Sequence, residues 1–279
     1  MKPSTFIIGS SGKTGSRILS RLKQLDYPVR LGSRNASPSF DWEKPDEWES
    51  AIQGVDQVYI SFQPDLAVPS SLEAIKKLVL VCKKNQVKRL VLLSGRGEPE
   101  ALACEQVVIH SGLEWTILRS SWFHQNFSEG MFLEQILGGN VLFPQVNARE
   151  PFVDLDDLAD LALASLTTDK HRNQLYELTG PELWNFREAF QYIAEVTNQT
   201  IPFEELPLDE YITALKGWGI PEDTTWLIDY LFRTVLDGRN ESVVSDLELA
   251  LGRKPKDFRT YVKETAKTGI WKLPLQATT

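Results

Sequence analysis

The first 120 residues alternate between short apolar runs and longer segments in which apolar residues recur at helical spacing. The apolar runs, which we expect to be strands, are 5–9, 28–34, 57–62, 87–94 and 114–120. Several of them are apolar on both faces, as in parallel strands that helices cover from above and below. This order is typical of βαβ units. It predicts an α/β protein with a Rossmann-type, doubly wound parallel sheet.

After Phe127 the pattern changes, because segments with helical spacing dominate. We expect helices at 154–167, 186–196, 209–218 and 225–236, and residues 174–180 are the only further clear strand. These patterns predict a Rossmann domain over residues 1–150, to whose sheet residues 151–180 return. A smaller, mainly helical region is expected over residues 181–279.

The composition excludes several classes of protein. A formal net charge of -8 disfavours a nucleic acid or an anionic membrane as partner. No apolar run is long enough for a signal peptide or a membrane span, so we expect a cytoplasmic protein. The two cysteines are expected to be reduced, and no spacing of His, Cys and acidic residues suggests a metal site.

A glycine-rich loop follows the first expected strand. Its glycines have the spacing G-x-x-G-x-x-G, and a Walker A loop for ATP is excluded because its first glycine would fall at Ile7. Between a strand and a helix, such a loop lets the backbone approach a pyrophosphate at the helix N-terminus. The alternative is a turn that only packs the helix on the strand. The loop residues expected at a dinucleotide are Gly9, Ser10, Ser11, Gly12, Lys13, Thr14 and Gly15.

The end of the second expected strand indicates which dinucleotide binds. An NAD site places Asp or Glu there for the ribose hydroxyls, whereas this chain has Ser33 and Arg34. Arg34 can bind the 2′-phosphate of NADP(H), and Ser33 can add a hydrogen bond. NADP(H) is therefore the expected cofactor, and the alternative is a solvated surface arginine.

Five further residues are expected along the same dinucleotide. Asp41 stands where related folds pair a carboxylate with the adenine amine, although an ordinary loop acid is equally consistent with the sequence. Phe62 and Gln63 are expected on the adenosine side, and Ser94 and Gly95 beside the nicotinamide ribose.

Most short-chain dehydrogenases use a Tyr-x-x-x-Lys pair, in which the lysine helps the tyrosine to exchange a proton with the substrate. None of the seven tyrosines has Lys four residues later. The segment 99–112, where the pair would sit, contains neither residue type. Hydride transfer would therefore suit a substrate that needs little proton donation, such as a quinone or an iminium ion.

An aromatic run follows the fifth expected strand. Trp122, Phe123 and Phe127 could form a wall for a planar substrate, with His124 or Asn126 as hydrogen-bond or proton partners. His124 is the single candidate for a catalytic acid. The alternative is that these aromatic residues belong to the core.

Six segments give the chain a resemblance to the NmrA-like branch of the atypical short-chain dehydrogenases. They are GSSGKTG (9–15), FDWEKPDEWESAIQGVDQVYI (40–60), SGLEWTILRSSWFHQNFSE (111–129), PFVDLDDLADLA (151–162), LTGPELWNFREA (178–189) and LGRKPKDFRTYVKE (251–264). Within this branch the chain most resembles the fungal ergot-alkaloid reductases of the festuclavine synthase and agroclavine dehydrogenase type. One departure is Ser120, where the branch usually has proline.

The resemblance implies an NADP-binding domain over residues 1–150 and a substrate-binding region over 181–279. It leaves two functions open. One is an NADPH-dependent reductase acting on a small planar electrophile, such as a quinone, an azo compound or an iminium ion. The other is a non-catalytic NADP(H) sensor, for which a protein partner is expected. A sugar-nucleotide epimerase is disfavoured, because that chemistry needs the absent Tyr-Lys pair.

Overall fold

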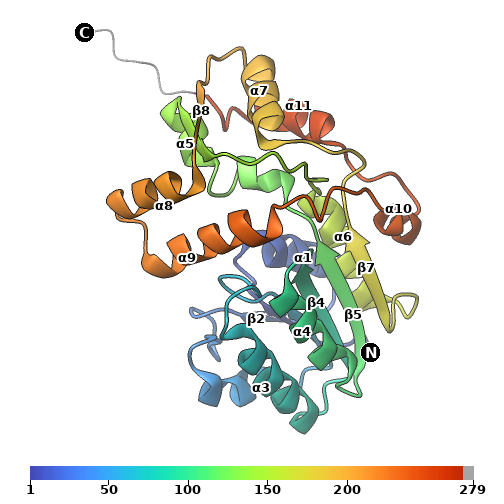
Figure 1. The fold of residues 1–279 in the computed structure, drawn as a ribbon. Coiled ribbons are helices and arrows are strands. Elements are labelled where there is room, and N and C mark those ends of the chain that lie inside the picture. The colour runs from blue at the N-terminus through green and yellow to red at the C-terminus, as the bar shows by residue number, and fades with distance from the viewer. Residues whose placement is uncertain (273–279) are drawn as a thin grey trace. The chain divides into compact units, whose positions relative to one another are not determined.

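The computed structural model describes residues 1–272, which form two compact units (Figure 1). Unit 1 consists of Met1–Ser120, Leu155–Leu178 and Ser245–Lys254. Unit 2 consists of Ser121–Asp154, Thr179–Val244 and, within the described residues, 255–272.

Unit 1 is built around a six-stranded sheet in the order β2-β1-β3-β4-β5-β7. All neighbouring strands are parallel. The strands are β1 (Thr5–Ile8), β2 (Val29–Gly32), β3 (Gln57–Ile60), β4 (Arg89–Gly95), β5 (Glu114–Ser120) and β7 (Gln174–Leu178). The predicted doubly wound Rossmann-type sheet is thus confirmed, and Ser120, despite its departure from the family pattern, pairs with Gly95 at the end of β5.

Helices cover both faces of this sheet. They are α1 (Lys13–Gln24), α2 (Trp48–Ile52), α3 (Ser71–Lys84), α4 (Pro99–Ile109), α6 (Leu155–Thr167) and α10 (Asp246–Leu251), with a 3-10 turn at Pro45–Glu47. Helix α1 packs against α6, while α3 packs against α2 and α4. In Figure 1 α3 and α4 lie in front of the sheet, with α1 and α6 behind it. Each helix turns an apolar face inward, as Ile18 and Leu22 of α1 do.

The core of unit 1 explains why its strands are apolar on both faces. Every residue of β1 and β3 is buried. Phe6, Val58, Leu90 and Ile117 come from four neighbouring strands and belong to one hydrophobic cluster. The carboxyl ends of these strands therefore form a stable edge, which is where open parallel sheets bind ligands.

Unit 2 is mainly helical, as expected for the later part of the chain. Its helices are α5 (Leu133–Gly138), α7 (Phe186–Thr197), α8 (Leu208–Gly217), α9 (Glu222–Tyr230) and α11 (Phe258–Thr268), with a 3-10 turn at His124–Phe127 and a π-helical turn at Leu231–Val235. It also contains two short parallel strands, β6 (Val141–Pro144) and β8 (Phe203–Leu206). The sequence pattern had indicated only one clear strand after Phe127, so β6 and β8 were missed.

Aromatic side chains fill the core of unit 2. Phe127, Phe132, Phe143 and Phe190 are fully buried or nearly so and belong to one cluster. The ring centroids of Phe127 and Phe132 are 5.1 Å apart, a distance at which aromatic rings stabilise each other.

None of the helices in residues 1–272 combines the length and the apolar character needed to cross a bilayer.

Candidate dinucleotide-binding site

A tight glycine turn joins β1 to α1. The backbone N–H of Gly12 donates to the carbonyl of Gly9 over 2.8 Å, and Gly9 has a φ of +73°, which favours glycine. A Cβ at Gly15 would lie only 2.2 Å from the Gly9 carbonyl oxygen. The two glycines thus allow α1 to begin directly against the end of β1, as the sequence spacing predicts.

The N-terminus of α1 is suited to an anion. Gly12 is the N-cap in an extended conformation, it contributes no side-chain cap, and the first turn contains no acidic residue. Backbone N–H groups and the helix dipole at such a terminus favour a phosphate. Ser10 and Thr14 are buried in the turn, and Lys13 is the first residue of the helix.

A pocket of about 450 Å³ opens beside this turn, within the size range of cofactor sites. It is lined by six residues predicted for a dinucleotide: Gly9, Ser11, Ser33, Arg34, Asp41 and Gln63. These residues come from the loops that follow β1, β2 and β3, so the sheet brings together segments that are far apart in sequence.

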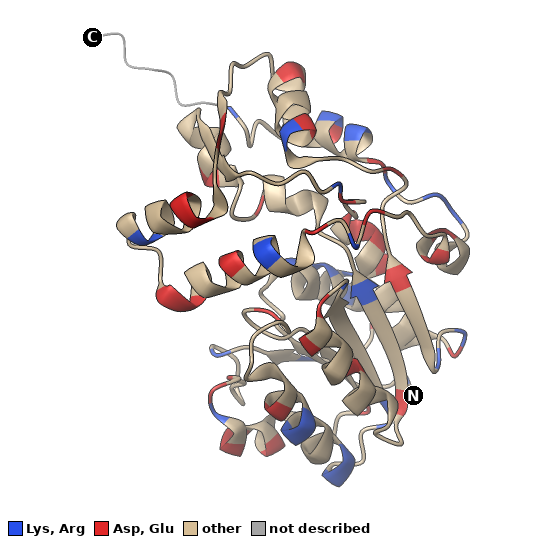
Figure 2. Cartoon of the chain, in the orientation of Figure 1, with Lys and Arg blue, Asp and Glu red and all other residues tan. Residues whose placement is uncertain are grey.

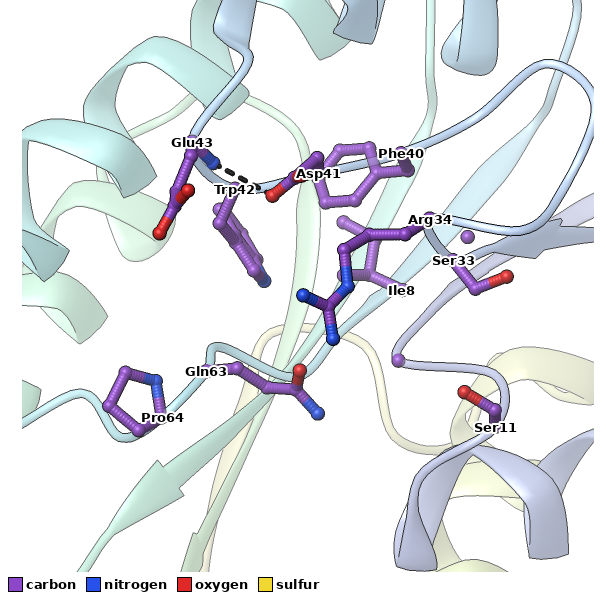
Figure 3. A pocket seen from close by; sticks show the side chains of 12 residues that line it. Ile8, Ser11, Ser33, Arg34, Phe40, Asp41, Trp42, Glu43, Gln63 and Pro64 are labelled. Carbon is purple, nitrogen blue, oxygen red and sulfur yellow. Dashed lines mark hydrogen bonds between the residues drawn. The ribbon is translucent and has the colours of Figure 1, made fainter. Parts of the chain in front are cut away.

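Arg34 is the cation of this pocket. Strand β2 ends at Gly32, and Ser33 and Arg34 follow at once. Figure 3 shows the Arg34 guanidinium pointing into the pocket, toward Gln63 and the ring of Trp42. Its side chain is exposed, and it forms no ion pair within residues 1–272. The guanidinium is thus available for an anionic group.

The loop after Arg34 forms the opposite wall and is held by its own hydrogen bonds. Asp41 Oδ1 accepts the backbone N–H of Glu43 over 3.1 Å. The indole N–H of Trp48 donates to the Asp41 carbonyl over 2.6 Å. Asp41 therefore keeps a fixed place at the pocket.

Aromatic rings support this wall. The ring centroids of Phe40 and Trp42 are 5.1 Å apart, and those of Trp42 and Phe62 are 4.6 Å apart. Phe62 therefore stands behind Trp42 and does not line the pocket. Six lining residues were not among the predicted ones: Ile8, Gly32, Phe40, Trp42, Glu43 and Pro64. The sequence signal that could have found two of them is the pair of aromatic residues that flank Asp41.

Ser94 and Gly95 end β4 and do not line this pocket. The Ser94 hydroxyl donates to Glu105 Oε1 of α4 over 2.6 Å, so its remaining lone pairs can only accept. Their contact with a nicotinamide ribose stays a prediction.

The aromatic run 122–127 belongs to unit 2. Phe127 is fully buried in its core, while Trp122, Phe123 and Asn126 are half-buried. His124 is also fully buried. Its Nδ1 lies 3.5 Å from Asp154 Oδ2, and the ring packs against Phe258 and Tyr261. The roles predicted for these side chains in binding or catalysis stay predictions.

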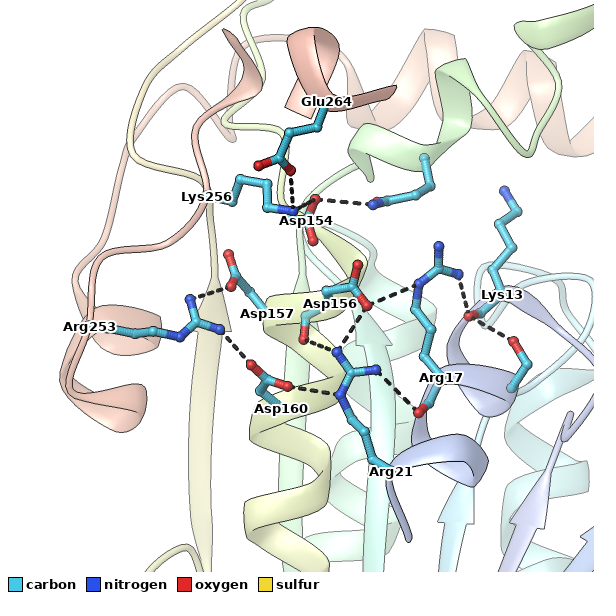
Figure 4. A network of polar contacts seen from close by, with 12 residues as sticks. Lys13, Arg17, Arg21, Asp154, Asp156, Asp157, Asp160, Arg253, Lys256 and Glu264 are labelled. Carbon is cyan, nitrogen blue, oxygen red and sulfur yellow. Dashed lines mark hydrogen bonds and ion pairs between the residues drawn. The ribbon is translucent and has the colours of Figure 1, made fainter. Parts of the chain in front are cut away.

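A network of ion pairs, which we call the ladder, connects α1, the helix that follows the glycine turn, to α6 (Figure 4). Arg21 contacts Asp156 at 2.9 Å and Asp160 at 2.8 Å. Arg253 continues the ladder to Asp160 and Asp157 at 2.5 Å each. The ladder fixes the helix whose N-terminus faces the proposed anion site.

Basic and acidic residues are interspersed along the helices of each unit (Figure 2). Within unit 1 we relate two neighbouring features to an anion, the pocket and the N-terminus of α1, whereas the formal net charge of the whole chain is -8.

A doubly wound sheet with a glycine turn and a pocket at the ends of β1, β2 and β3 defines a dinucleotide-binding protein of the Rossmann class. Residues 9–169 match the family model described as NAD(P)H-binding, and the chain belongs to this family.

Curated relatives extend over nearly the whole chain. Agroclavine dehydrogenase from Claviceps fusiformis is 26% identical, and the match covers 95% of this chain and 98% of the relative. NAD(P)H azoreductase from Xenophilus azovorans is 23% identical, with 94% and 97% covered. These relatives agree with the resemblance to the ergot-alkaloid reductases.

A solved structure shows the same fold. The NADPH-dependent quinone oxidoreductase from Escherichia coli, complexed with NADPH, has a TM-score of 0.78 and 17% identity. The match covers 94% of this chain and 99% of that one.

Proposed function

We propose that the protein is an NADPH-dependent reductase that transfers hydride to a small planar electrophile. The preference for NADPH rests on Arg34, which points into the pocket from the end of β2. An acidic residue at this place would repel a 2′-phosphate, whereas a guanidinium can bind two of its oxygens. Ser33 can donate a further hydrogen bond.

The residues present fit the cofactor. The pyrophosphate would lie at the N-terminus of α1, where Gly9, Gly12 and Gly15 keep side chains away. The adenosine would occupy the pocket walled by Trp42 and Asp41. When bound, NADPH supplies the hydride.

The electrophile we propose is a quinone, an azo compound or an iminium ion. The lack of a Tyr-x-x-x-Lys pair disfavours ketone and sugar chemistry. The names of the azoreductase and agroclavine dehydrogenase support planar nitrogen compounds. We propose the half-buried Trp122, Phe123 and Asn126 as substrate contacts, whereas Phe127 and the candidate acid His124 are fully buried within unit 2.

The test is a titration of the purified protein with NADPH, NADP⁺, NADH and NAD⁺, followed by NADPH absorbance after addition of each acceptor. We expect tighter binding of the phosphorylated dinucleotides and oxidation of NADPH by at least one acceptor. Tight binding without oxidation would favour the non-catalytic sensor. Equal affinity for NADPH and NADH would contradict the role of Arg34.

A further inference from the structure

Two carboxyl groups meet at the carboxyl ends of β3 and β4. Asp65 lies in the loop after β3, directly after Pro64, which lines the cofactor pocket. Glu98 is the N-cap residue of α4, in the loop after β4. The two carboxyl groups lie close enough together that each affects the pKa of the other. The sheet thus places these two acidic residues next to the cofactor pocket, on the side where β4 neighbours β3.

The contact with Gly95 fixes where Glu98 lies. A Cβ on Gly95 would come within 2.2 Å of both carboxyl oxygens, so the carboxyl group rests against the last residue of β4. In a doubly wound sheet the two halves of a dinucleotide lie across this edge. Because the adenosine pocket lies toward β2, the nicotinamide half would lie toward β4, where the pair is.

Burial makes two ionised carboxylates at this place unfavourable. Glu98 is 7% exposed, and its Oε2 atom receives no hydrogen bond from a donor in residues 1–272. A buried charge without a donor is costly, whereas a shared proton satisfies both groups. Burial, and then the charge of Asp65, raise the pKa of Glu98 well above its usual range.

The proton is held mainly on Glu98. Burial raises the pKa of Asp65 as well, but the backbone N–H of Ala67 donates to Asp65 Oδ1 over 2.9 Å and favours its ionised form. The charges of Glu100 and Glu105 also act on Glu98 and oppose its ionisation.

The cationic side chains nearby in unit 1 are bound to other carboxylates. Arg119 binds Glu105 and Glu177, and Arg96 also binds Glu177. The ion pairs of these two arginines are thus made with Glu105 and Glu177.

We propose that the Asp65–Glu98 pair is the proton donor for neutral acceptors, in place of the missing Tyr-x-x-x-Lys pair. This inference rests on the proposed reductase function. An azo compound gains hydride on one nitrogen and the proton from Glu98 on the other, which gives a hydrazine. NADPH leaves as NADP⁺, and the pair then takes a proton from water.

The chemistry of the acceptor decides whether the pair is needed. A cationic triphenylmethane dye becomes neutral when its central carbon accepts hydride, so no proton is required. A neutral azo compound would become a strongly basic anion if no proton were supplied. Loss of the Asp65–Glu98 pair should therefore slow reduction of the neutral azo compound and have much less effect on reduction of the cationic dye.

The experiment compares a neutral azobenzene dye with crystal violet in the wild type and in Glu98→Gln. This variant keeps the single negative charge on Asp65 but removes the shared proton. We expect the ratio of azo to crystal violet turnover to fall by roughly 100-fold or more, the scale of general acid catalysis. Asp65→Asn provides a second variant, and it should also lower the ratio.

A matched control is Glu73→Gln, the same change in the first turn of α3, where the carboxylate is exposed. Its ratio should equal that of the wild type. In the wild type the ratio should fall as the pH rises and the pair loses its proton. Crystal violet turnover shows that each variant is folded and binds NADPH.

A second measurement needs neither cofactor nor acceptor. Because the folded pair has a raised pKa, the folded state binds its proton more tightly than the unfolded chain. The urea midpoint of the wild type, relative to that of Glu98→Gln, should therefore fall as the pH rises from the usual pKa range of a glutamate carboxyl into the range where the folded pair loses its proton.

An unchanged ratio in Glu98→Gln and Asp65→Asn, with both dyes reduced, would overturn the proton-donor role and leave the reductase function standing. An unchanged difference in urea midpoint across this pH range would overturn the shared proton itself. Reduction of neither dye by the wild type would overturn the proposed function together with this inference.

Discussion

Arg119 at the end of β5 binds Glu105 of α4 through two hydrogen bonds, Nε to Oε1 at 2.9 Å and Nη2 to Oε2 at 2.5 Å. Glu105 is fully buried and also accepts the Ser94 hydroxyl. Helix α4 is thus joined to the ends of both β4 and β5 by one buried carboxylate.

Replacing this carboxylate should destabilise unit 1. Glu105→Ala leaves the partly buried guanidinium of Arg119 without one partner, and breaking a buried ion pair costs about 3–5 kcal/mol. Urea unfolding would measure the loss. Glu73→Ala, which breaks the exposed pair with Lys76, should leave stability unchanged within error. A similar loss in both variants would contradict the importance of the buried pair.

Arg34→Ala should affect the binding of NADPH and of NADH differently. Loss of a charge-assisted contact to the 2′-phosphate should weaken NADPH binding by ~1.5–3 kcal/mol and leave NADH binding nearly unchanged. Isothermal titration calorimetry with both dinucleotides would measure this. If the two affinities fell equally, Arg34 would not be the phosphate ligand.

Gly15→Ala should disturb the glycine turn. The new Cβ would lie 2.2 Å from the Gly9 carbonyl oxygen, so α1 must move away from β1. Such overpacking costs about 1–3 kcal/mol, and NADPH binding should weaken as well. Gly217→Ala is the control, because a Cβ there meets no atom within 4 Å and the residue lies in α8. That variant should be as stable as the wild type or slightly more stable.

The two cysteines should resist thiol reagents in the folded protein. Cys82 and Cys104 are both fully buried, and burial raises the pKa of the Cys82 thiol to about 12. Because the thiolate is the reactive form, the fraction that can react at pH 8 is very small. Ellman's reagent should therefore detect both thiols only after denaturation. Rapid reaction of the native protein would contradict the burial of these side chains.

The fold of unit 1 could be predicted largely from local pattern. The strand 114–120 and the helix expected at 154–167 lie where apolar periodicity places them. In unit 2 the strands β6 and β8 escaped prediction. Each has four residues, and the pairing partner of Val141 is Phe203, far along the chain. Such a short pair is defined by its partner more than by its own residues.

The lining of the cofactor pocket likewise divides into residues that local sequence predicted and residues that only packing revealed. The glycine spacing and the Ser33-Arg34 end of β2 predicted six of its lining residues, because each signal lies within a single βαβ unit. Phe40 and Trp42 flank Asp41 in the sequence, but their place in the wall depends on packing against Phe62 and Trp48. Their role as lining residues therefore needed the structure.

The sequence by itself determined the class of fold, the position of the dinucleotide turn and the cation at the end of β2. Each of these depends on residues close together in the chain, where periodicity and backbone geometry act directly. Only the tertiary structure decided that the Glu98 carboxyl group is buried against Gly95 and that Glu105 joins α4 to two strands. These relationships arise when parallel strands bring separate loops to one edge, and burial there changes the chemistry of the side chains.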